Sequence, residues 1–373
     1  MMEESLRRRI AEFIAHATVA RGVNLFAGAC IGTHKGAREQ NQDRAVVLFA
    51  DYPALPRKNF IMGVVCDGIG GSSHGEEAAV LSLSKFISCM IQESHLPCQK
   101  RLRYAAFAAN DFVYRAFRGK SGSTLAAMMI SNDAVCGTNA GDSRIYGVTT
   151  KGDLKQLSRD DTMADVLGEH GDINFYRNQL VQHIGMGEGI QPQAIWANRH
   201  DFIKFLLTTD GIHGISNEAF RDVSQVSSSD ENYIHRLLLL NEALGGKDNG
   251  TAIALSSNIE ASEIKPSWGL NLKFLSPFDH LEIWFPASAA RVQRGSRSPE
   301  SPEIVESDSR HPRKPSPAAE GEMLASEGKA KGKRPRVRSG RSNKKRKLRD
   351  EARSPPDEAA PPLEIRFPDD EGG

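Results

Sequence analysis

The chain has 373 residues, of which 39% are hydrophobic and 25% charged, and its net charge is +1. This composition is typical of a globular protein with a sizeable core. No apolar run approaches the ~20 residues needed to span a bilayer, so we expect no integral membrane association. The charge is uneven, because residues 329–349 hold twelve Lys and Arg and no acid; removing those twelve from +1 leaves about −11 for the rest. We therefore expect an acidic folded body.

The N-terminal residues and the cysteines bear on where the protein works. The N-terminus begins with charge and lacks the apolar core of a secretory signal. We expect residues 1–22 to form a helical extension. The five cysteines are odd in number and have no CxxC spacing, which argues against a disulfide framework and against a zinc site. Together these features predict a cytoplasmic protein.

The next part of the chain alternates short apolar runs with amphipathic stretches. The run NFIMGVVC (59–66) has the composition of a buried strand that ends at Asp67. Residues 75–94 and 100–117 carry apolar side chains at three- and four-residue spacing, which predicts two helices. Further strands are expected, between Gly, Asn and Asp turns, at 123–130, 134–139, 143–149, 202–209 and 250–257.

Two long helices among many short strands predict sheets that pack face to face and are covered by helices. A doubly wound parallel sheet would need more frequent helices. We place the folded domain at 23–258 and a short extension, packed on or near it, at 259–286. Residues 287–373 are rich in Pro, Ser, Gly and charge with almost no aromatic residues, which predicts a disordered tail.

The tail carries two features of its own. The basic segment 329–349 could contact nucleic acid, another acidic surface or the acidic body itself, or could simply be solvated. The string LEIWFP (281–286) recurs as LEIRFP (363–368). Alternating Leu, Ile and Phe would form one face of a short strand that Pro ends, so the second copy is either a chance similarity or a segment that docks on, or competes for, a sheet edge.

Five aspartates lie at the ends of the expected strands: Asp43, Asp67, Asp142, Asp210 and Asp248. A single Asp-Gly is more often only a turn, but carboxylates held at several strand ends suit a divalent cation, which would offset their mutual repulsion. The alternative of a nucleotide loop is disfavoured, because GIGGSSHG (68–75) lacks the Lys-Ser/Thr ending of a P-loop and does not fit GxGxxG.

At this point the sequence resembles the metal-dependent serine/threonine phosphatases of the PPM (PP2C-type) family, in its bacterial branch. The resemblance rests on eight blocks that follow the family order: GAREQNQDR, CDGIGGSSHGEEAA, SGSTLAAMMI, NAGDSRIYGV, LSRDDT, LVQHIGMG, LLTTDGIHGIS and KDNGTAIAL. Each block is weak alone, but together they occur in order over about two-thirds of the chain, from about residue 32 to 256. The resemblance implies an α+β fold, a four-layer αββα sandwich of two antiparallel sheets flanked by helices, with metals between the sheet ends.

The resemblance also implies metal ligands. Asp67 matches the aspartate that bridges two metals, and Gly68 the glycine that lends its carbonyl. Asp210 and Asp248 match the other direct ligands, while Asp43 matches an acid that acts on the metal shell, partly through water. The metals would be two Mn²⁺ or Mg²⁺ ions.

Two more positions follow from the resemblance. Asp142 matches a residue that, with Asp210, holds a third and weaker metal in bacterial members. Arg38 matches the arginine that receives the substrate phosphate, for which a guanidinium fork is suited. Gln42 departs from the pattern, because an acid often stands there in the family. A hydroxide that bridges the metals would attack phosphorus, so Asp67, Asp43 and Arg38 are the expected catalytic residues.

The expected function is hydrolysis of phosphoserine and phosphothreonine on proteins, with a cognate Ser/Thr kinase as the opposing enzyme. One alternative is a catalytically weak scaffold or phosphoprotein-binding module that acts through its basic tail. The intact set of Asp43, Asp67, Asp210 and Asp248 argues against it, because a binding-only fold has no need for every ligand. A phosphatase of small phosphometabolites is the other alternative.

Overall fold

The computed structural model describes residues 2–15, 21–52, 55–69, 74–167, 179–214, 217–258 and 269–286. All of these fall within the first of the two units of the chain, residues 1–301. The expected tail at 287–373, with its basic segment and the second LEIxFP copy, lies outside the described residues. No helix of the described part is both long and apolar enough to cross a membrane.

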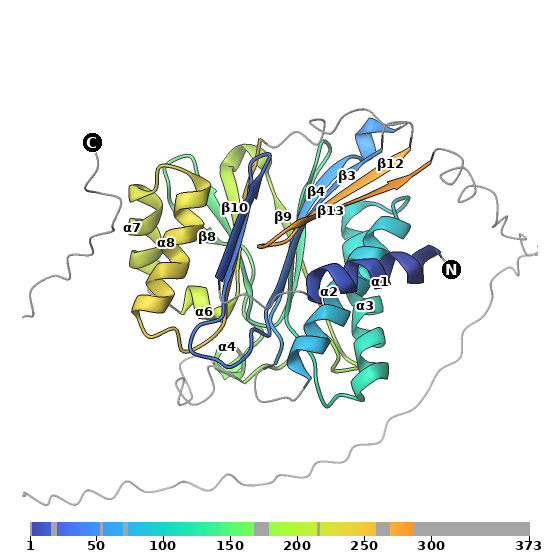
Figure 1. The fold of residues 1–373 in the computed structure, drawn as a ribbon, viewed down its shortest axis with the longest axis horizontal. Helices are drawn as coiled ribbons and strands as arrows, with labels where there is room; N and C mark the ends of the chain where they lie inside the picture. The colour runs from blue at the N-terminus through green and yellow to red at the C-terminus, as the bar shows by residue number, and fades with distance from the viewer. Residues whose placement is uncertain are drawn as a thin grey trace, which may run out of the picture. The chain divides into compact units, whose positions relative to one another are not determined.

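Thirteen described strands form two sheets in which every neighbouring pair is antiparallel (Figure 1). The seven-stranded sheet contains, in spatial order, β13 (His280–Phe285), β12 (Leu270–Leu275), β3 (Arg44–Asp51), β4 (Phe60–Cys66), β5 (Leu125–Ser131), β6 (Val135–Ala140) and β9 (Gln193–Ala197). The six-stranded sheet contains β1 (Arg21–Phe26), β2 (Ala29–His34), β11 (Gly250–Ser256), β10 (Phe202–Thr208), β7 (Arg144–Thr149) and β8 (Leu154–Gln156).

Helices cover the outer face of each sheet (Figure 1). The seven-stranded sheet is covered by α1 (Met2–Ala15), α2 (Gly75–Gln92) and α3 (Cys98–Phe117). The six-stranded sheet is covered by α6 (Asp210–His213), α7 (Asn217–Val226) and α8 (Asp230–Ala243). The short elements η1 (Pro56–Lys58), α4 (Met163–Leu167) and η3 (Arg199–Asp201) lie in connections. This arrangement confirms the expected sandwich of two antiparallel sheets flanked by helices.

Three apolar cores lie between these layers, and β3 contributes side chains to two of them. All eight residues of β3 are buried. Val46 and Leu48 face the helices of the α1–α3 layer, whereas Val47 and Phe49 face the other sheet. Because successive side chains of a strand point to opposite faces, a central strand covered on both sides reads as a continuous apolar run rather than an alternating one.

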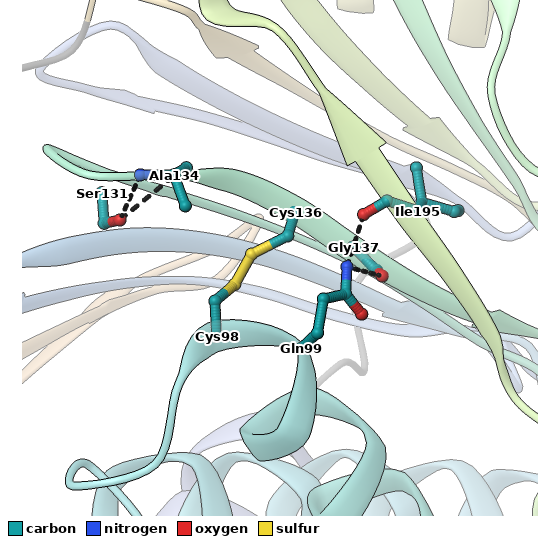
Figure 2. Close-up of a disulfide and its surroundings, with 7 residues drawn as sticks. All are labelled: Cys98, Gln99, Ser131, Ala134, Cys136, Gly137 and Ile195. Carbon is teal, nitrogen blue, oxygen red and sulfur yellow. Dashed lines mark hydrogen bonds between the residues drawn. A yellow bond between two sulfur atoms is a disulfide. The ribbon is translucent and has the colours of Figure 1, made fainter.

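One pair of cysteines forms a disulfide, so the expectation of a chain without disulfides was wrong for this pair. Cys98, the first residue of α3, is joined to Cys136 on β6, and their Cα atoms are 6.8 Å apart (Figure 2). Gln99 lies beside this link, and its Nε2 donates a hydrogen bond to the Ile195 carbonyl at 2.6 Å. The two cysteines lie 38 positions apart in sequence, so only the packing of α3 over β6 brings them together. Cys30, Cys66 and Cys89 are free and buried.

Candidate active site

The five predicted aspartates come together where strand ends of the two sheets meet, and one of them, Asp210, begins α6 (Figure 1). The reason is topological, because antiparallel neighbours alternately start and end at the same edge of a sheet. In the seven-stranded sheet, Asp43 stands just before β3 and Asp67 just after its neighbour β4. In the six-stranded sheet, Asp210 follows β10 and Asp248 lies just ahead of β11. Asp142 lies in the crossing from β6 to β7, which joins the two sheets.

The carboxyl group of Asp67 is influenced by the charges of all four other aspartates. Burial raises the pKa of its carboxyl well above the ordinary value, and the charges of Asp43, Asp210, Asp142 and Asp248 raise it further. The backbone around Asp67 is fixed by Thr124, whose Oγ1 accepts a hydrogen bond from the Asp67 amide at 2.9 Å. The Asp67 carbonyl in turn accepts one from the Thr124 amide at 2.8 Å. This side chain therefore projects from a rigid strand end into a field of like charge.

Asp43 is the most buried of the five, with 2% of its surface exposed. Its Oδ2 accepts a hydrogen bond from the Thr209 hydroxyl at 2.8 Å. Burial raises the pKa of Asp43 to about 7, against the opposing effect of hydrogen bonds from Thr251 and Thr209. Asp210 and Asp248 contribute a further rise through their charge.

Burial and neighbouring charges also raise the pKa values of Asp210 and Asp142. Burial, together with the charge of Asp248, raises the pKa of Asp210 to about 6. Burial raises the pKa of Asp142 to about 7, with Asp210 and Asp160 adding to the rise. The cluster therefore holds more negative charge than its own hydrogen bonds offset near neutral pH, which is the condition that favours a bound cation.

Two buried oxygens show that this cluster fits a cation. Asp43 Oδ1 and Asp210 Oδ1 are both shielded from solvent and have no hydrogen-bond partner in the described part of the chain. Buried carboxylate oxygens normally have partners, so each has a free coordination position for a hard cation. In the described ranges, no three Asp, Glu, His or Cys side chains already converge as a formed metal site. Carboxylate oxygens of this kind suit hard divalent cations.

Arg38 does not stand free in the structure. Its Nη2 donates a hydrogen bond to Asp248 Oδ2 at 2.7 Å, and its Nε donates to the Lys247 carbonyl at 3.1 Å. The Arg38 side chain is 45% exposed and that of Asp248 37% exposed, so this ion pair is open to solvent. The expected phosphate-binding residue and one expected metal ligand therefore hold each other at the rim of the cluster.

Gly68 occupies a place where only a glycine fits. A Cβ at this position would lie 2.3 Å from the Gly75 carbonyl oxygen, at the start of α2. The Gly68 amide donates to the Gln42 carbonyl at 3.3 Å, which ties the segment after β4 to the segment before β3. The Asp67–Gly68 turn thus lies between the backbones of Gly75 and Gln42, which fix its position at the cluster.

Several residues that hold the acids in place were not among the predicted site residues. Thr209 is one, and Thr251 joins it, because its amide donates to Thr209 Oγ1 at 2.9 Å. Asn249 is another: its Nδ2 donates to the Lys35 and Gln40 carbonyls, and its Oδ1 accepts from the Gln42 amide. These residues occur inside the TTDG and KDNGT blocks, next to the acids, which is the signal that could have identified them.

Arg44, the residue after Asp43, is a buried cation that pairs with an acid outside the cluster. It is 3% exposed, its Nη1 donates to the Asn41 and Asp43 carbonyls, and its Nη2 pairs with Glu76 on α2. His213, which follows Asp210 on α6, is also buried, and its Nδ1 is hydrogen-bonded to Thr208 Oγ1 at 2.9 Å. Burial holds the pKa of His213 well below its ordinary value, so it is a neutral structural residue.

Comparison with solved structures identifies the fold. The chain is similar to the PPM Ser-Thr phosphatase MsPP from Mycobacterium smegmatis in complex with cacodylate, with 24% identity, 61% of this chain and 97% of that chain covered, and a TM-score of 0.50. It is similar to the Mycobacterium tuberculosis serine/threonine phosphatase PstP/Ppp, with 23% identity, 61% and 98% coverage and a TM-score of 0.51.

The chain is also similar to the serine/threonine phosphatase Stp1 from Staphylococcus aureus, with 20% identity, 63% and 96% coverage and a TM-score of 0.55. No protein-family model matches the sequence, and no curated protein matches it. At these identities the likeness shows a shared fold: the described domain has the PPM phosphatase sandwich, as the sequence motifs predicted.

Proposed function

We propose that the protein is a metal-dependent phosphatase that hydrolyses phosphoserine and phosphothreonine on proteins. The observation that carries this proposal is the meeting of five aspartates at one end of a PPM-type sandwich, two of them with buried oxygens that lack any partner in the described ranges. Such a cluster is costly to fold without a cation and has no evident structural use.

The metals would be held by Asp43, Asp67, Asp210, Asp248 and the Gly68 carbonyl, and Asp142 with Asp210 would hold a third. When bound, Mn²⁺ or Mg²⁺ would neutralise the cluster, activate water as the nucleophile and polarise the phosphoryl group. Asp67 and Asp210 belong to different sheets, so the sandwich itself sets their separation.

The protein's own residues would position the substrate. The Arg38 guanidinium, once released from Asp248, can take two phosphate oxygens through its fork. Thr209 keeps the Asp43 carboxylate oriented by donating to Oδ2, which leaves Oδ1 for a ligand. The exposure of both Arg38 and Asp248 supports this exchange of partners, because neither has to cross a packed core.

The substrates we propose are phosphorylated proteins, with a Ser/Thr kinase as the opposing enzyme and the cytoplasm as the compartment. The basic segment 329–349 would bring the domain to nucleic acid or to an acidic surface, because twelve positive charges within 21 residues bind polyanions without needing a fold.

The test is phosphate release from a phosphothreonine peptide by the full-length protein, with Mn²⁺, Mg²⁺ or EDTA. We expect metal-dependent turnover that Asp67→Asn and Asp210→Asn each reduce by roughly a hundredfold or more, since loss of even an outer-shell partner costs 10–100-fold. Asp153→Asn is the matched control, because Asp153 is exposed and lies in the turn between β7 and β8, at the far end of β7 from Asp142. Folded protein without turnover under any metal would instead favour the scaffold.

A further inference from the structure

The edge strand β13 has a near-copy later in the chain. It contains the string LEIWFP, and LEIRFP occurs at 363–368. Among the described residues β13 is the outermost strand of the seven-stranded sheet and pairs on one side only, with β12. An edge strand held by one neighbour can be replaced by another segment of suitable pattern.

The side chains of β13 divide cleanly between two faces. Leu281, Ile283 and Phe285 pack on the core beneath α1–α3, and Ile283 is only 7% exposed. Glu282 and Trp284 point the other way and are exposed, Trp284 to 51%. Binding beside β12 therefore depends on the Leu, Ile and Phe of the string, while the residue at the fourth position is free of core packing.

The second copy keeps every residue that this place requires. Leu363, Ile365 and Phe367 repeat the three inward residues, and Pro368 repeats the proline that follows β13. Glu282 pairs with Lys273 on β12 at 3.1 Å, and Glu364 would bring the same carboxylate to the same lysine. The one difference in six residues, Arg366 in place of Trp284, falls on the exposed face.

That one difference lies opposite a buried amide. Asn271 on β12 faces Trp284 directly in the β-ladder and is fully buried, yet neither its Nδ2 nor its Oδ1 has a hydrogen-bond partner among the described residues. A buried amide without partners is destabilising. An arginine opposite it brings five N–H donors to the Oδ1 acceptor, so the second copy offers a contact that β13 does not make.

The connecting length permits the exchange. Residues 287–362, 76 in number, separate the two copies. A chain of that length can reach up to about 250 Å when extended, far more than a return to the same edge requires. Being part of the same molecule, the second copy competes at an effective concentration that the connection sets, whatever the protein concentration.

We propose that the outer edge of β12 is a strand-binding site with two alternative occupants from the same chain, β13 (His280–Phe285) and the segment 363–368. Displacement would free Trp284 and the β12–β13 turn at 276–279. That turn lines a cavity of about 160 Å³ together with Asp43 and Arg44. The exchange of strands would therefore change the shape of a cavity beside the carboxylate cluster. The proposal concerns binding of this strand and does not depend on the phosphatase activity.

Cysteine cross-linking in the full-length protein tests the proposal. Opposite residues of antiparallel strands have Cα atoms about 4.5–5.5 Å apart, a separation that a disulfide spans. Lys273→Cys is combined with Glu364→Cys, and the reference pair Lys273→Cys with Glu282→Cys reports the occupancy seen in the structure. The matched control pairs Lys273→Cys with Glu358→Cys, a glutamate in the same tail but outside the repeated string.

Under mild oxidation we expect the 273–364 link to form roughly tenfold faster than the 273–358 link, because only a docked strand holds its cysteine opposite position 273. Adding Ile283→Ser, which weakens β13, should accelerate the 273–364 link and slow the 273–282 link. Equal rates for 364 and 358 would overturn the proposal. Cross-linked dimers in place of intramolecular links would overturn it too, by assigning the occupant to a second copy of the chain.

Discussion

At one end of the sandwich five aspartates from both sheets crowd together, whereas at the other end Cys98 is bonded to Cys136 and Gln99 donates to a carbonyl of β9 (Figure 2). Both ends join elements that are distant in sequence. The acidic end does so with groups that repel each other, and the cystine end with a covalent bond and neutral hydrogen bonds.

The difference teaches that the groups suited to chemistry are confined to one end of the strands. Strand β6 connects the two ends, with Cys136 near its start and Asp142 just beyond its end. The cystine end fixes α3 against the sheet, and the acidic end uses the resulting rigid strand ends to hold like charges close together. Changes at the cystine end should therefore affect stability but not turnover, whereas changes at the acidic end should affect both.

The largest effect on stability is expected from the charge of the acidic end. Burial raises the pKa of Asp43 from 3.8 to about 7 in the folded protein. Between these values the folded state binds more protons than the unfolded state, so the free energy of unfolding falls as the pH rises through this window. Because the charges of Asp210 and Asp248 also raise this pKa, the loss belongs to the cluster as a whole and is on the order of a few kcal/mol. Thermal unfolding in EDTA, followed across this pH range, measures it.

The control for this prediction is a variant in which the Asp43 carboxyl is replaced by an amide. Asp43→Asn removes the titrating group but keeps an oxygen for the Thr209 hydroxyl, so the unfolding midpoint should depend less on pH than in the unaltered protein. Mn²⁺ should raise the midpoint most at neutral pH, where the carboxylates are ionised. A midpoint in EDTA that rises or stays level as the pH increases would contradict the assignment.

A smaller loss is expected at the cystine end. Cys136→Ser should lower the free energy of unfolding by about 2–4 kcal/mol, because the disulfide restricts the unfolded chain. Turnover of a phosphopeptide at a temperature where the variant is folded should be unchanged, since Cys136 lies at the far end of β6 from Asp142. A reductant should lower the free energy of unfolding of the unaltered protein by the same amount and leave that of Cys136→Ser unchanged. Equal effects of the reductant on both proteins would argue against the Cys98–Cys136 disulfide.

The smallest effect on stability is expected when either of two neighbouring threonines, Thr208 or Thr209, is replaced, and metal dependence should distinguish the two variants. Thr209→Val removes the hydroxyl that donates to Asp43 Oδ2, whereas Thr208→Val removes one bonded to His213. Each should cost about 1–3 kcal/mol, because each leaves a buried polar atom without its partner. Only Thr209→Val should also raise the Mn²⁺ concentration needed for half-maximal activity. Equal metal dependence in the two variants would show that Thr209 does not position the acid.

The sequence predicted the fold through local patterns and motif order. The helices at 75–94 and 100–117 were expected from apolar spacing and correspond to α2 and α3. The pairing of Cys98 with Cys136 was missed, since nothing in the spacing of cysteines encodes which helix packs over which strand. The hydrogen bonds that Thr209 and Asn249 make to the site were missed for the same reason, as their partners lie more than 160 residues away.

What the sequence determined by itself is the set of acids and their place at strand ends, because an apolar run followed by Asp-Gly is a local signal. It also contained both copies of the LEIxFP string. Only the tertiary structure decided that the acids of two sheets share one site, that Arg38 rests on Asp248, and that the fourth residue of the string faces a buried amide without partners. Those facts depend on strand order and register, which are set by packing between distant segments and not by any neighbouring residue.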